Sequence, residues 1–264
     1  MPELRGRRAL VCGASHGIGQ AAAVALAEAG ATVVVLARDA SALEAVRGQL
    51  PAPFDQAHDT LVADFRDPDN VESSVKGLLE REGPIEVLIN NTGGPTDGPL
   101  SEAEPEDFLT ALDQHLGMSH RLARALVPGM REHGYGRIVN VTSTSVRLPI
   151  AGLGVSNTVR AAVHAWVRTL AAELGPDGIT VNNVLPGYTD TGALRELLHD
   201  RAERLSVSDD ELAVRWRGNV PLGRFADPAE VAAAIRFLAS PAASYITGID
   251  LPVDGGRIAV QVPL

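Results

Sequence analysis

The sequence predicts an α/β fold in which helices cover both faces of a parallel β-sheet. The first observation is the alternation of short apolar runs with Ala-rich helical runs along nearly the whole chain. The second is that runs such as ATVVVLAR, at residues 31–38, are apolar without a polar alternation, which is typical of strands buried on both faces. Alternating strands and helices, joined by right-handed crossovers, give a doubly wound, Rossmann-type sheet.

The expected elements follow from these runs in order. The first strand, RALVCG, ends at a glycine, and the helix after it has small and apolar residues at helical spacing and closes on a second glycine. By the same patterns we expect strands at 8–13, 31–38, 58–65, 85–94, 136–145, 179–187 and 248–256, and the run at 85–94 is a strand that leads into a loop. We expect helices at 19–30, 41–50, 68–83, 107–134, 155–178 and 228–240, the fourth being one long helix. Residues 190–220 are more polar and helical, with no strand pattern.

Composition bounds the function. The 264 residues are 45% hydrophobic, enough for the core of a single domain spanning 1–264. The net charge of -10 argues against nucleic acid, which needs clustered cations, and against an anionic membrane surface. Cys12 is the single cysteine, no Cys/His cluster has zinc spacing, and no 18-residue apolar run is present. The first residues lack a long apolar stretch, so we expect no signal peptide. We expect a soluble cytoplasmic protein with no metal, nucleic-acid or membrane partner.

A glycine-rich turn follows the first strand. Gly13, Gly17 and Gly19 have the spacing G-x-x-x-G-x-G and stand between a strand and a helix. Such a turn lets the backbone approach a pyrophosphate, and the helix N-terminus supplies amide donors. The alternative is a tight turn needed only for packing. We assign the whole turn to a dinucleotide site, including the intervening residues Ser15, His16 and Ile18.

The end of the second strand selects the form of the dinucleotide. Ala37 offers no carboxylate for the ribose hydroxyls of NAD, and Arg38 follows it. An arginine can pair bidentately with a 2′-phosphate, so the sequence predicts NADP(H) over NAD(H). The adjacent acid, Asp39, counts against this prediction, and the alternative for Arg38 is a solvated surface charge.

Further motifs extend the pattern to most of the chain. They are NNTGG at 90–94, GRIVNVTS at 136–143, PGYTDT at 186–191, VPLGRFADPAEVA at 220–232 and YITGIDLPVDGG at 245–256. Together with the glycine turn they resemble the short-chain dehydrogenase/reductase family, and most of all its β-ketoacyl-ACP-reductase-like members. The resemblance runs from about residue 6 to residue 256, with Thr92 in place of the family's usual alanine.

The resemblance implies further cofactor contacts. It places Asp64 against the adenine ring, and it places Asn90, Thr92 and Gly93 on the adenosine ribose side. It places Pro186, Gly187 and Thr191 at the nicotinamide end. Two of these residues have structural alternatives that can coexist with binding: Asp64 as a strand-end cap and Thr191 as a helix N-cap.

The catalytic positions depart from the family. Its members usually reduce a carbonyl with an Asn, a Ser, a Tyr and a Lys. The resemblance places Ser143 at the Ser position, Ser156 at the Tyr position, Arg160 at the Lys position and His115 at the Asn position. A divergent subgroup of reductase-like sequences shares this lack of Tyr and Lys. Ser156 and Arg160 stand at i and i+4, so they share one helix face, and Arg160 can still donate to a ribose hydroxyl.

The proton donor is therefore open among three alternatives. A serine hydroxyl is a far weaker acid than a phenol, which titrates near ~10. His115 is one candidate donor, against the alternative of an ordinary helix histidine. Tyr188 is a second, against the alternative of an apolar pocket wall. The third alternative is that the substrate needs no strong acid. In that case Ser143 and Ser156 would donate hydrogen bonds to the charge that develops on the substrate.

These observations favour an NADP(H)-dependent oxidoreductase that reduces a ketone, a β-ketoacyl compound or an imine by hydride transfer with an altered site. The alternative is a protein that keeps the fold without redox turnover. It would bind the cofactor structurally, act as a partner or sensor, or catalyse a non-redox step such as dehydration.

Residues 190–220 stand where the family places its substrate lid. Leu194, Leu197, Leu198 and Trp216 would form an apolar roof, and Arg215 and Arg217 would meet an anionic or carrier-bound substrate. The alternative is a solvated amphipathic helix pair. In the family, the helices that match 108–133 and 154–175 pair across a two-fold axis, which implies a homodimer or homotetramer.

Overall fold

The computed structural model describes residues 3–95 and 97–259. These residues form a seven-stranded sheet in which every pair of neighbouring strands is parallel, in the order β3-β2-β1-β4-β5-β6-β7. The strands are β1 Arg8–Cys12, β2 Thr32–Ala37, β3 Asp59–Val62, β4 Val87–Asn90, β5 Gly136–Val141, β6 Ile179–Pro186 and β7 Asp250–Val253. The doubly wound, Rossmann-type fold expected from the alternating pattern is thereby confirmed.

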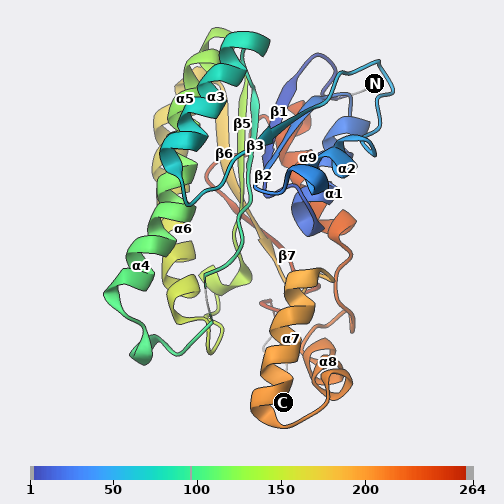
Figure 1. The fold of residues 1–264 in the computed structure, drawn as a ribbon, viewed down its shortest axis with the longest axis vertical. Coiled ribbons are helices and arrows are strands. Elements are labelled where there is room, and N and C mark those ends of the chain that lie inside the picture. The colour runs from blue at the N-terminus through green and yellow to red at the C-terminus, as the bar shows by residue number, and fades with distance from the viewer. Residues whose placement is uncertain (1–2, 96, 260–264) are drawn as a thin grey trace.

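Helices cover both faces of the sheet (Figure 1). One face carries α1 Gly17–Glu28, α2 Ala40–Arg47 and α9 Pro228–Ala239. The other carries α3 Pro68–Glu82, α5 Met118–Glu132 and α6 Gly154–Leu174, with α4 Pro105–Leu112 ahead of α5. Two further helices, α7 Gly192–Leu205 and α8 Asp209–Gly218, extend beyond the carboxyl end of the sheet, so residues 190–220 are helical as expected.

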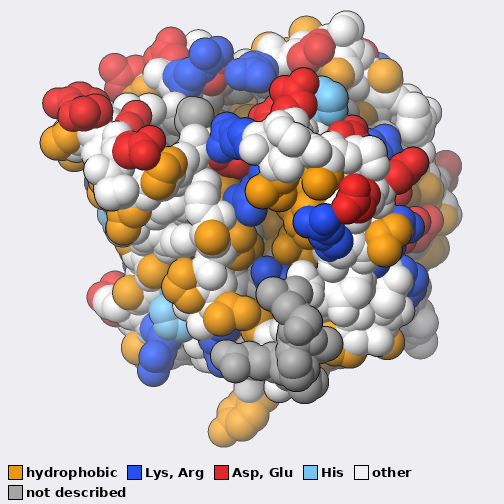
Figure 2. Space-filling view, turned by 90° about the horizontal axis from the view of Figure 1, so that it is seen from below, with side chains coloured by type: hydrophobic (Ala, Val, Ile, Leu, Met, Phe, Trp, Pro, Cys, Tyr) orange, Lys and Arg blue, Asp and Glu red, His pale blue; other side chains and the backbone are white. Residues whose placement is uncertain are grey.

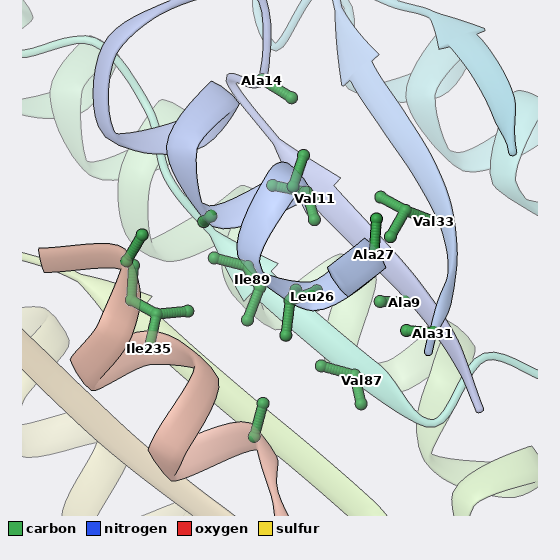
Figure 3. Packing of buried hydrophobic residues seen from close by; sticks show 14 of the residues in the cluster. Ala9, Val11, Ala14, Leu26, Ala27, Ala31, Val33, Val87, Ile89 and Ile235 are labelled. Atoms are coloured by element: carbon green, nitrogen blue, oxygen red, sulfur yellow. The ribbon is translucent and has the colours of Figure 1, made fainter. Parts of the chain in front are cut away.

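The core beneath α1 and α9 is built from small and branched side chains (Figure 3). Leu26 and Ala27 of α1 and Ile235 of α9 are fully buried against the sheet. They meet the strand residues Ala9, Val11, Val33, Val87 and Ile89. Small residues let helices approach the sheet closely, which explains how a chain with 4% aromatic residues still fills its core.

The single cysteine closes the first strand. Cys12 is fully buried at the end of β1, directly before the glycine turn. Burial disfavours the thiolate and raises the pKa of this thiol. Cys12 is therefore an inert core residue in the folded state.

The long helix predicted over residues 107–134 is present, because α4, a π-helical segment and α5 follow one another without a gap from Pro105 to Glu132, but it is not regular. A π-helical segment at Asp113–Gly117 separates α4 from α5, and Pro128 lies inside α5. The hydroxyl of Ser119 donates to the carbonyl of His115 at 2.6 Å, which helps to satisfy the widened turn. Single π-helical turns occur often at functional sites, and His115 lies in the middle of this one.

The strand order fixes where a ligand can bind. β1 has β2 on one side and β4 on the other, so the chain reverses its direction of winding between β1 and β4. In open α/β sheets, ligands occupy the crevice outside the carboxyl ends of the strands at such a switch point. In the described part of the chain, no helix is both long enough and apolar enough to cross a bilayer.

Candidate active site

The glycine turn after β1 is too crowded for other residues. Gly13 and Gly17 both have φ of 59°. A Cβ on Gly19 would stand 2.1 Å from the carbonyl oxygen of Gly13, and a Cβ on Gly13 would stand 2.5 Å from the carbonyl oxygen of Asn91. The Asn91 amide also donates to the Gly13 carbonyl at 3.1 Å. Glycine is therefore required here by backbone contacts as well as by conformation.

The N-terminus of α1 is left uncapped. His16 occupies the N-cap position without a side-chain bond to the helix, and the first turn holds no acid. By contrast, side chains cap α2, α3 and α7. Free amides at a helix N-terminus suit an anion, so this turn fits a dinucleotide pyrophosphate. Ser15 Oγ and His16 Nδ1 share a hydrogen bond at 2.9 Å, and Ile18 packs against the core.

Arg38 and Asp39 differ sharply at the end of β2. Arg38 is exposed, and no carboxylate of the described residues pairs with it. The Asp39 carboxylate is occupied, because it accepts from the Ala42 amide at 3.0 Å and from the Ser41 hydroxyl at 2.8 Å. These bonds lower the pKa of Asp39, the Ala42 bond most. The acid that counted against NADP(H) is therefore a helix cap of α2.

Asp64 is also engaged at the end of β3. Its carboxylate accepts from the backbone amide of Arg66 at 3.0 Å and from the Arg66 guanidinium at 3.0 Å. These bonds, above all the side-chain one, lower the pKa of Asp64. The expected strand-end cap is present, and contact of Asp64 with an adenine ring stays a prediction.

The loop after β4 meets the π-helical segment. Asn90 is buried, and its amide donates to Asn140 at 2.9 Å, while its own Oδ1 has no hydrogen-bond partner among the described residues. Thr92 Oγ1 lies 2.7 Å from His115 Nδ1. At Gly93 a Cβ would meet nothing within 4 Å. Gly93 is exposed, whereas Asn90 and His115 are buried. Contact of Asn90, Thr92 and Gly93 with a ribose stays a prediction.

The loop after β6 reaches back to the glycine turn. The Gly187 amide donates to Val253 at 2.9 Å, and a Cβ on Gly187 would stand 2.7 Å from Asp254 Cα. Thr191 caps α7 by accepting from the Leu194 amide at 3.3 Å, and its Cγ2 lies 3.2 Å from the Cβ position of Gly17. Pro186 ends β6 beside them. The start of α7 and the glycine turn therefore lie side by side.

Ser156 and Arg160 form one hydrogen-bonded unit in the first turns of α6. Arg160 Nε donates to Ser156 Oγ at 3.1 Å, and Nη1 donates to the Thr142 carbonyl at 2.7 Å. Its Nη2 lies 3.8 Å from the Cβ position of Gly94. Burial lowers the pKa of Arg160 to about 10, so the group stays protonated at neutral pH. The shared helix face expected from the i, i+4 spacing is confirmed.

His115 is poorly suited to donate a proton. It is only 6% exposed, and its Nε2 has no hydrogen-bond partner among the described residues. Burial first, and the charge of Arg160 second, lower the pKa of His115 to about 3. The imidazole is therefore neutral at pH 7 and holds no imidazolium proton to release.

Tyr188 belongs to an aromatic wall. Its ring stacks on Trp216 with centroids 4.9 Å apart and planes at 8°, and it meets Phe225 edge-on at 5.9 Å. Arg257, on the loop after β7, places its guanidinium 4.6 Å from the centroid of the Tyr188 ring. This packing favours the alternative role of Tyr188 as a pocket wall.

A cavity of about 140 Å³ joins Ser143 to the helices α7 and α8. Ser143 follows β5, is half-buried, and its Oγ accepts from the Ser145 amide at 3.1 Å. The rest of the lining comes from Thr144, Ile150, Leu153, Pro186, Gly187, Tyr188, Leu194, Leu197, Arg201, Trp216 and Arg257. Figure 2 views this end of the molecule and shows apolar side chains around a central hollow with basic side chains near its edge.

The basic residues of this cavity are not the predicted ones. Arg215 pairs with Glu211 at 2.6 Å, and Arg217 lies over the Phe225 ring at 5.6 Å, so neither lines the cavity. Arg201 and Arg257 line it instead. Spacing offered a signal for Arg201, which stands at i+4 from Leu197 on one face of α7. Arg257 follows a glycine pair and had no periodic signal. Of the predicted roof, Leu194, Leu197 and Trp216 line the cavity, and Leu198 packs beneath them.

The chain resembles known reductases over nearly its full length. The family described as Enoyl-(Acyl carrier protein) reductase matches residues 13–257. An uncharacterised oxidoreductase of Mycobacterium tuberculosis is 35% identical over 94% of this chain and 90% of its own. The 3-oxoacyl-[acyl-carrier-protein] reductase of Vibrio cholerae is 34% identical over 97% of this chain and 99% of its own.

A solved structure agrees with these matches. The crystal structure of L-sorbose reductase from Gluconobacter frateurii, complexed with NADPH and L-sorbose, superposes with a TM-score of 0.91 and 29% identity. The match covers 98% of this chain and 100% of that one. Sequence, fold and the uncapped glycine turn all agree, and the chain therefore belongs to the short-chain dehydrogenase/reductase family of NAD(P)-dependent oxidoreductases.

Proposed function

We propose that the protein is an NADP(H)-dependent reductase of ketones, β-ketoacyl compounds or imines, in which a serine–arginine pair replaces the usual tyrosine–lysine pair. The observation that carries the proposal is the unit formed by Ser156 and Arg160. Its guanidinium is fixed by the Thr142 carbonyl, one residue before Ser143. The pair thus stands beside the serine that lines the substrate cavity.

The pair is suited to stabilise charge on a carbonyl oxygen. When bound, NADPH supplies a hydride to the carbonyl carbon. The Ser156 oxygen accepts from Arg160, which leaves its own hydrogen available to donate. Ser156 is buried and is not part of the cavity lining, so the proposal requires the substrate oxygen to reach past Ser143 to Ser156. Ser143 donates from the cavity side, and the half-buried cation of Arg160 stabilises the alkoxide through Ser156. The substrate oxygen finally takes a proton from water, so the net change is one hydride and one proton added across the double bond.

This arrangement favours substrates that need little acid assistance. Neither His115 nor Tyr188 is supported as a strong donor, because the first is neutral and the second is stacked in an aromatic wall. General acid catalysis is commonly worth roughly 10²–10⁴-fold. A β-dicarbonyl or an already protonated imine loses least from its absence. The third of the sequence-based alternatives is therefore the one we adopt.

The preference for NADP(H) rests on the end of β2. Arg38 is exposed, while the neighbouring carboxylate of Asp39 is held as a helix cap. A free guanidinium beside the adenosine ribose favours a 2′-phosphate. The sorbose reductase, crystallised with NADPH, is consistent with this choice.

A non-redox role is the second candidate. It is favoured by one observation: none of the side chains at the four catalytic positions is a proton donor that titrates near neutrality. Such a protein would bind the cofactor as a structural or sensing ligand, act as a partner of an active relative, or catalyse dehydration. Three further expectations stay proposals: residues 190–220 act as a lid, the substrate is small or carrier-bound, and the chain forms a homodimer or homotetramer.

The proposal is tested by NADPH oxidation with a panel of ketones, β-ketoacyl thioesters and cyclic imines. We expect turnover by the wild-type protein, and a fall in kcat of about 10²-fold in Ser156→Ala, because one donor to the oxyanion is lost. NADPH binding by this variant, followed by fluorescence, should be unchanged. Arg168→Gln, an exposed change on the same helix, is the control and should leave kcat unaltered.

Two results would contradict the proposal. An active wild type whose kcat does not change in Ser156→Ala would show that the serine has no role. No turnover with any substrate, in a protein that binds NADPH, would favour the non-redox candidate. The double change Ser156→Tyr with Arg160→Lys separates the two: a large gain of carbonyl reduction would indicate an ordinary scaffold that has lost its acid.

A further inference from the structure

Two arginines enter the substrate cavity from different elements. Arg201 comes from α7, and Arg257 comes from the loop that follows β7. Both are half-buried and line the cavity together with Ser143. No carboxylate among residues 3–95 and 97–259 pairs with either guanidinium, whereas Arg195 and Arg215 in the same region have acidic partners. The cavity therefore holds two guanidinium groups that form no ion pair with a carboxylate of the described residues.

Arg257 is held in a fixed orientation. Its guanidinium lies over the Tyr188 ring at 4.6 Å, and its Nη1 donates to Thr144 Oγ1 at 3.2 Å. The loop that carries it is tied by Asp254, whose two oxygens accept from the Gly256 amide at 3.0 Å and the Ile258 amide at 2.8 Å. The remaining N–H donors of Arg257 have no partner among the described residues. A planar donor set is thus presented ready for an acceptor.

Arg201 faces the same space from the helical side. Its Nη2 donates to the Ala151 carbonyl at 2.7 Å, and its guanidinium lies 5.9 Å from the Trp216 ring. Asp97 senses the charge of Arg201. Burial raises the pKa of Asp97, and the charges of Arg201 and Arg204 only partly oppose this. Asp97 does not form an ion pair with Arg201 and does not line the cavity, so it is no substitute for a bound anion.

We infer that the substrate is a small keto acid, whose carboxylate binds Arg257 and Arg201 while its ketone lies at Ser143. This inference rests on the proposed reductase function. A guanidinium matches a carboxylate in a planar, bidentate geometry. Because the whole chain carries a net charge of -10, an anion needs a local cationic site to enter this cavity. The other walls, which include Ile150 and Leu153, suit a short hydrocarbon body.

The volume of the cavity and the stoichiometry of the reaction both fit a small keto acid. The cavity of about 140 Å³ is smaller than the roughly 300–1,000 Å³ of drug-sized pockets, so a compact ligand is favoured over a long acyl chain. The ketone carbon gains a hydride from NADPH, its oxygen gains a proton from water, and the carboxylate is unchanged. The products are a hydroxy acid and NADP⁺.

The kinetic test compares each keto acid of five to eight carbons with its methyl ester, using NADPH oxidation. We expect kcat/KM of the wild type to favour the acids by about 10- to 100-fold, as for a charge-assisted hydrogen bond. In Arg257→Gln and Arg201→Gln this ratio should fall toward one, mainly through KM for the acids. Arg215→Gln is the matched control, since Arg215 lies on α8 with its own partner Glu211, and it should keep the wild-type ratio.

A binding test keeps this inference separate from the proposed function. Calorimetry with cyclohexanecarboxylate and with cyclohexanecarboxamide, in saturating NADP⁺, should show binding of the carboxylate only, at least 10-fold weaker in Arg257→Gln. Carboxylate binding that depends on Arg257 in a protein that reduces no ketone would support the anion site and overturn the reductase. Equal kcat/KM for acids and esters, or carboxylate binding that is equal in the wild type and Arg257→Gln, would overturn the anion site.

Discussion

Burial lowers the pKa of two neighbouring side chains, with opposite consequences for their charge at neutral pH. Arg160 keeps its proton, because its lowered pKa of about 10 is still well above 7. His115 loses its proton, because it is buried, next to that cation, and has no partner for Nε2 among the described residues. The site thus contains one fixed positive charge and one neutral ring, which suits stabilisation of an oxyanion better than proton transfer.

The lowered pKa of His115 makes folding sensitive to acid. The unfolded chain binds a proton near the ordinary value of 6.5, whereas the folded chain binds it only near 3. Between these values the unfolded state holds more protons, so stability is full above pH 6.5 and falls as the pH drops, by up to about 1.4 kcal/mol per unit. Urea unfolding from pH 7 to pH 4 should therefore show a shallower loss of stability in His115→Asn than in the wild type.

The control for this measurement is His199→Gln. His199 is exposed, and hydrogen bonding to Asp209 raises its pKa, so its removal should not make the protein more resistant to acid. Parallel curves for the wild type and His115→Asn would mean that His115 titrates in the folded protein as it does in the unfolded chain.

Residue positions were predictable where chemistry is local. The glycines of the turn, and the shared helix face of Ser156 and Arg160, followed from spacing of a few residues. Arg257 could not be found in this way, because its place over Tyr188 depends on how the loop after β7 packs against the loop after β6. For the same reason the sequence pointed to Arg215, whose charge is satisfied on its own helix.

At the scale of elements, the junction of β2 and α2 determines the expected cofactor preference. Because Asp39 is committed to capping α2, Arg38 is the free charge at this edge. We expect the wild type to bind NADPH more tightly than NADH in fluorescence titrations. Arg38→Gln should weaken NADPH binding by about 10- to 100-fold and leave NADH binding nearly unchanged.

Arg47→Gln, on the helix that follows Arg38, controls for the loss of a positive charge in this region. Arg47 lies in the last turn of α2 and pairs with Glu44 at 2.7 Å, so its removal should alter neither affinity. Wild-type affinity for NADH that equals or exceeds the affinity for NADPH would contradict the assignment of Arg38.

Helical and strand periodicity did not reveal the local detail where the chain leaves the sheet to build the site. The run at 85–94 is a strand that leads into a loop, as expected: β4 ends at Asn90, and Thr92 of the loop meets His115. The π-helical segment at Asp113–Gly117, inside the expected long helix, was not predicted. His115 in this widened turn contacts Thr92. Helical periodicity cannot reveal a contact between a helix and a distant loop.

At the scale of the whole molecule, the alternating pattern was sufficient to predict the fold, because parallel strands need crossover helices of the kind that the sequence contains. The convergence of distant loops was not predictable from the pattern alone. The contact of Thr191 with the glycine turn follows only when the strand order is known. Association into dimers or tetramers stays a prediction.

The buried thiol of Cys12 can report how often the folded chain opens locally. A thiol reagent can reach this side chain only when the chain opens around the end of β1, so the rate of labelling measures how often that opening occurs. A dinucleotide that binds only the closed form should slow labelling by the factor 1 + L/Kd, where L is its free concentration, which is about 100-fold at a hundred times its Kd. Labelling by dithionitrobenzoate, followed with and without NADPH, would report this directly. Labelling as fast as that of a free thiol would contradict it. If NADPH slows labelling as expected, the reactivity of Cys12 measures the opening of the nucleotide crevice without any attached probe.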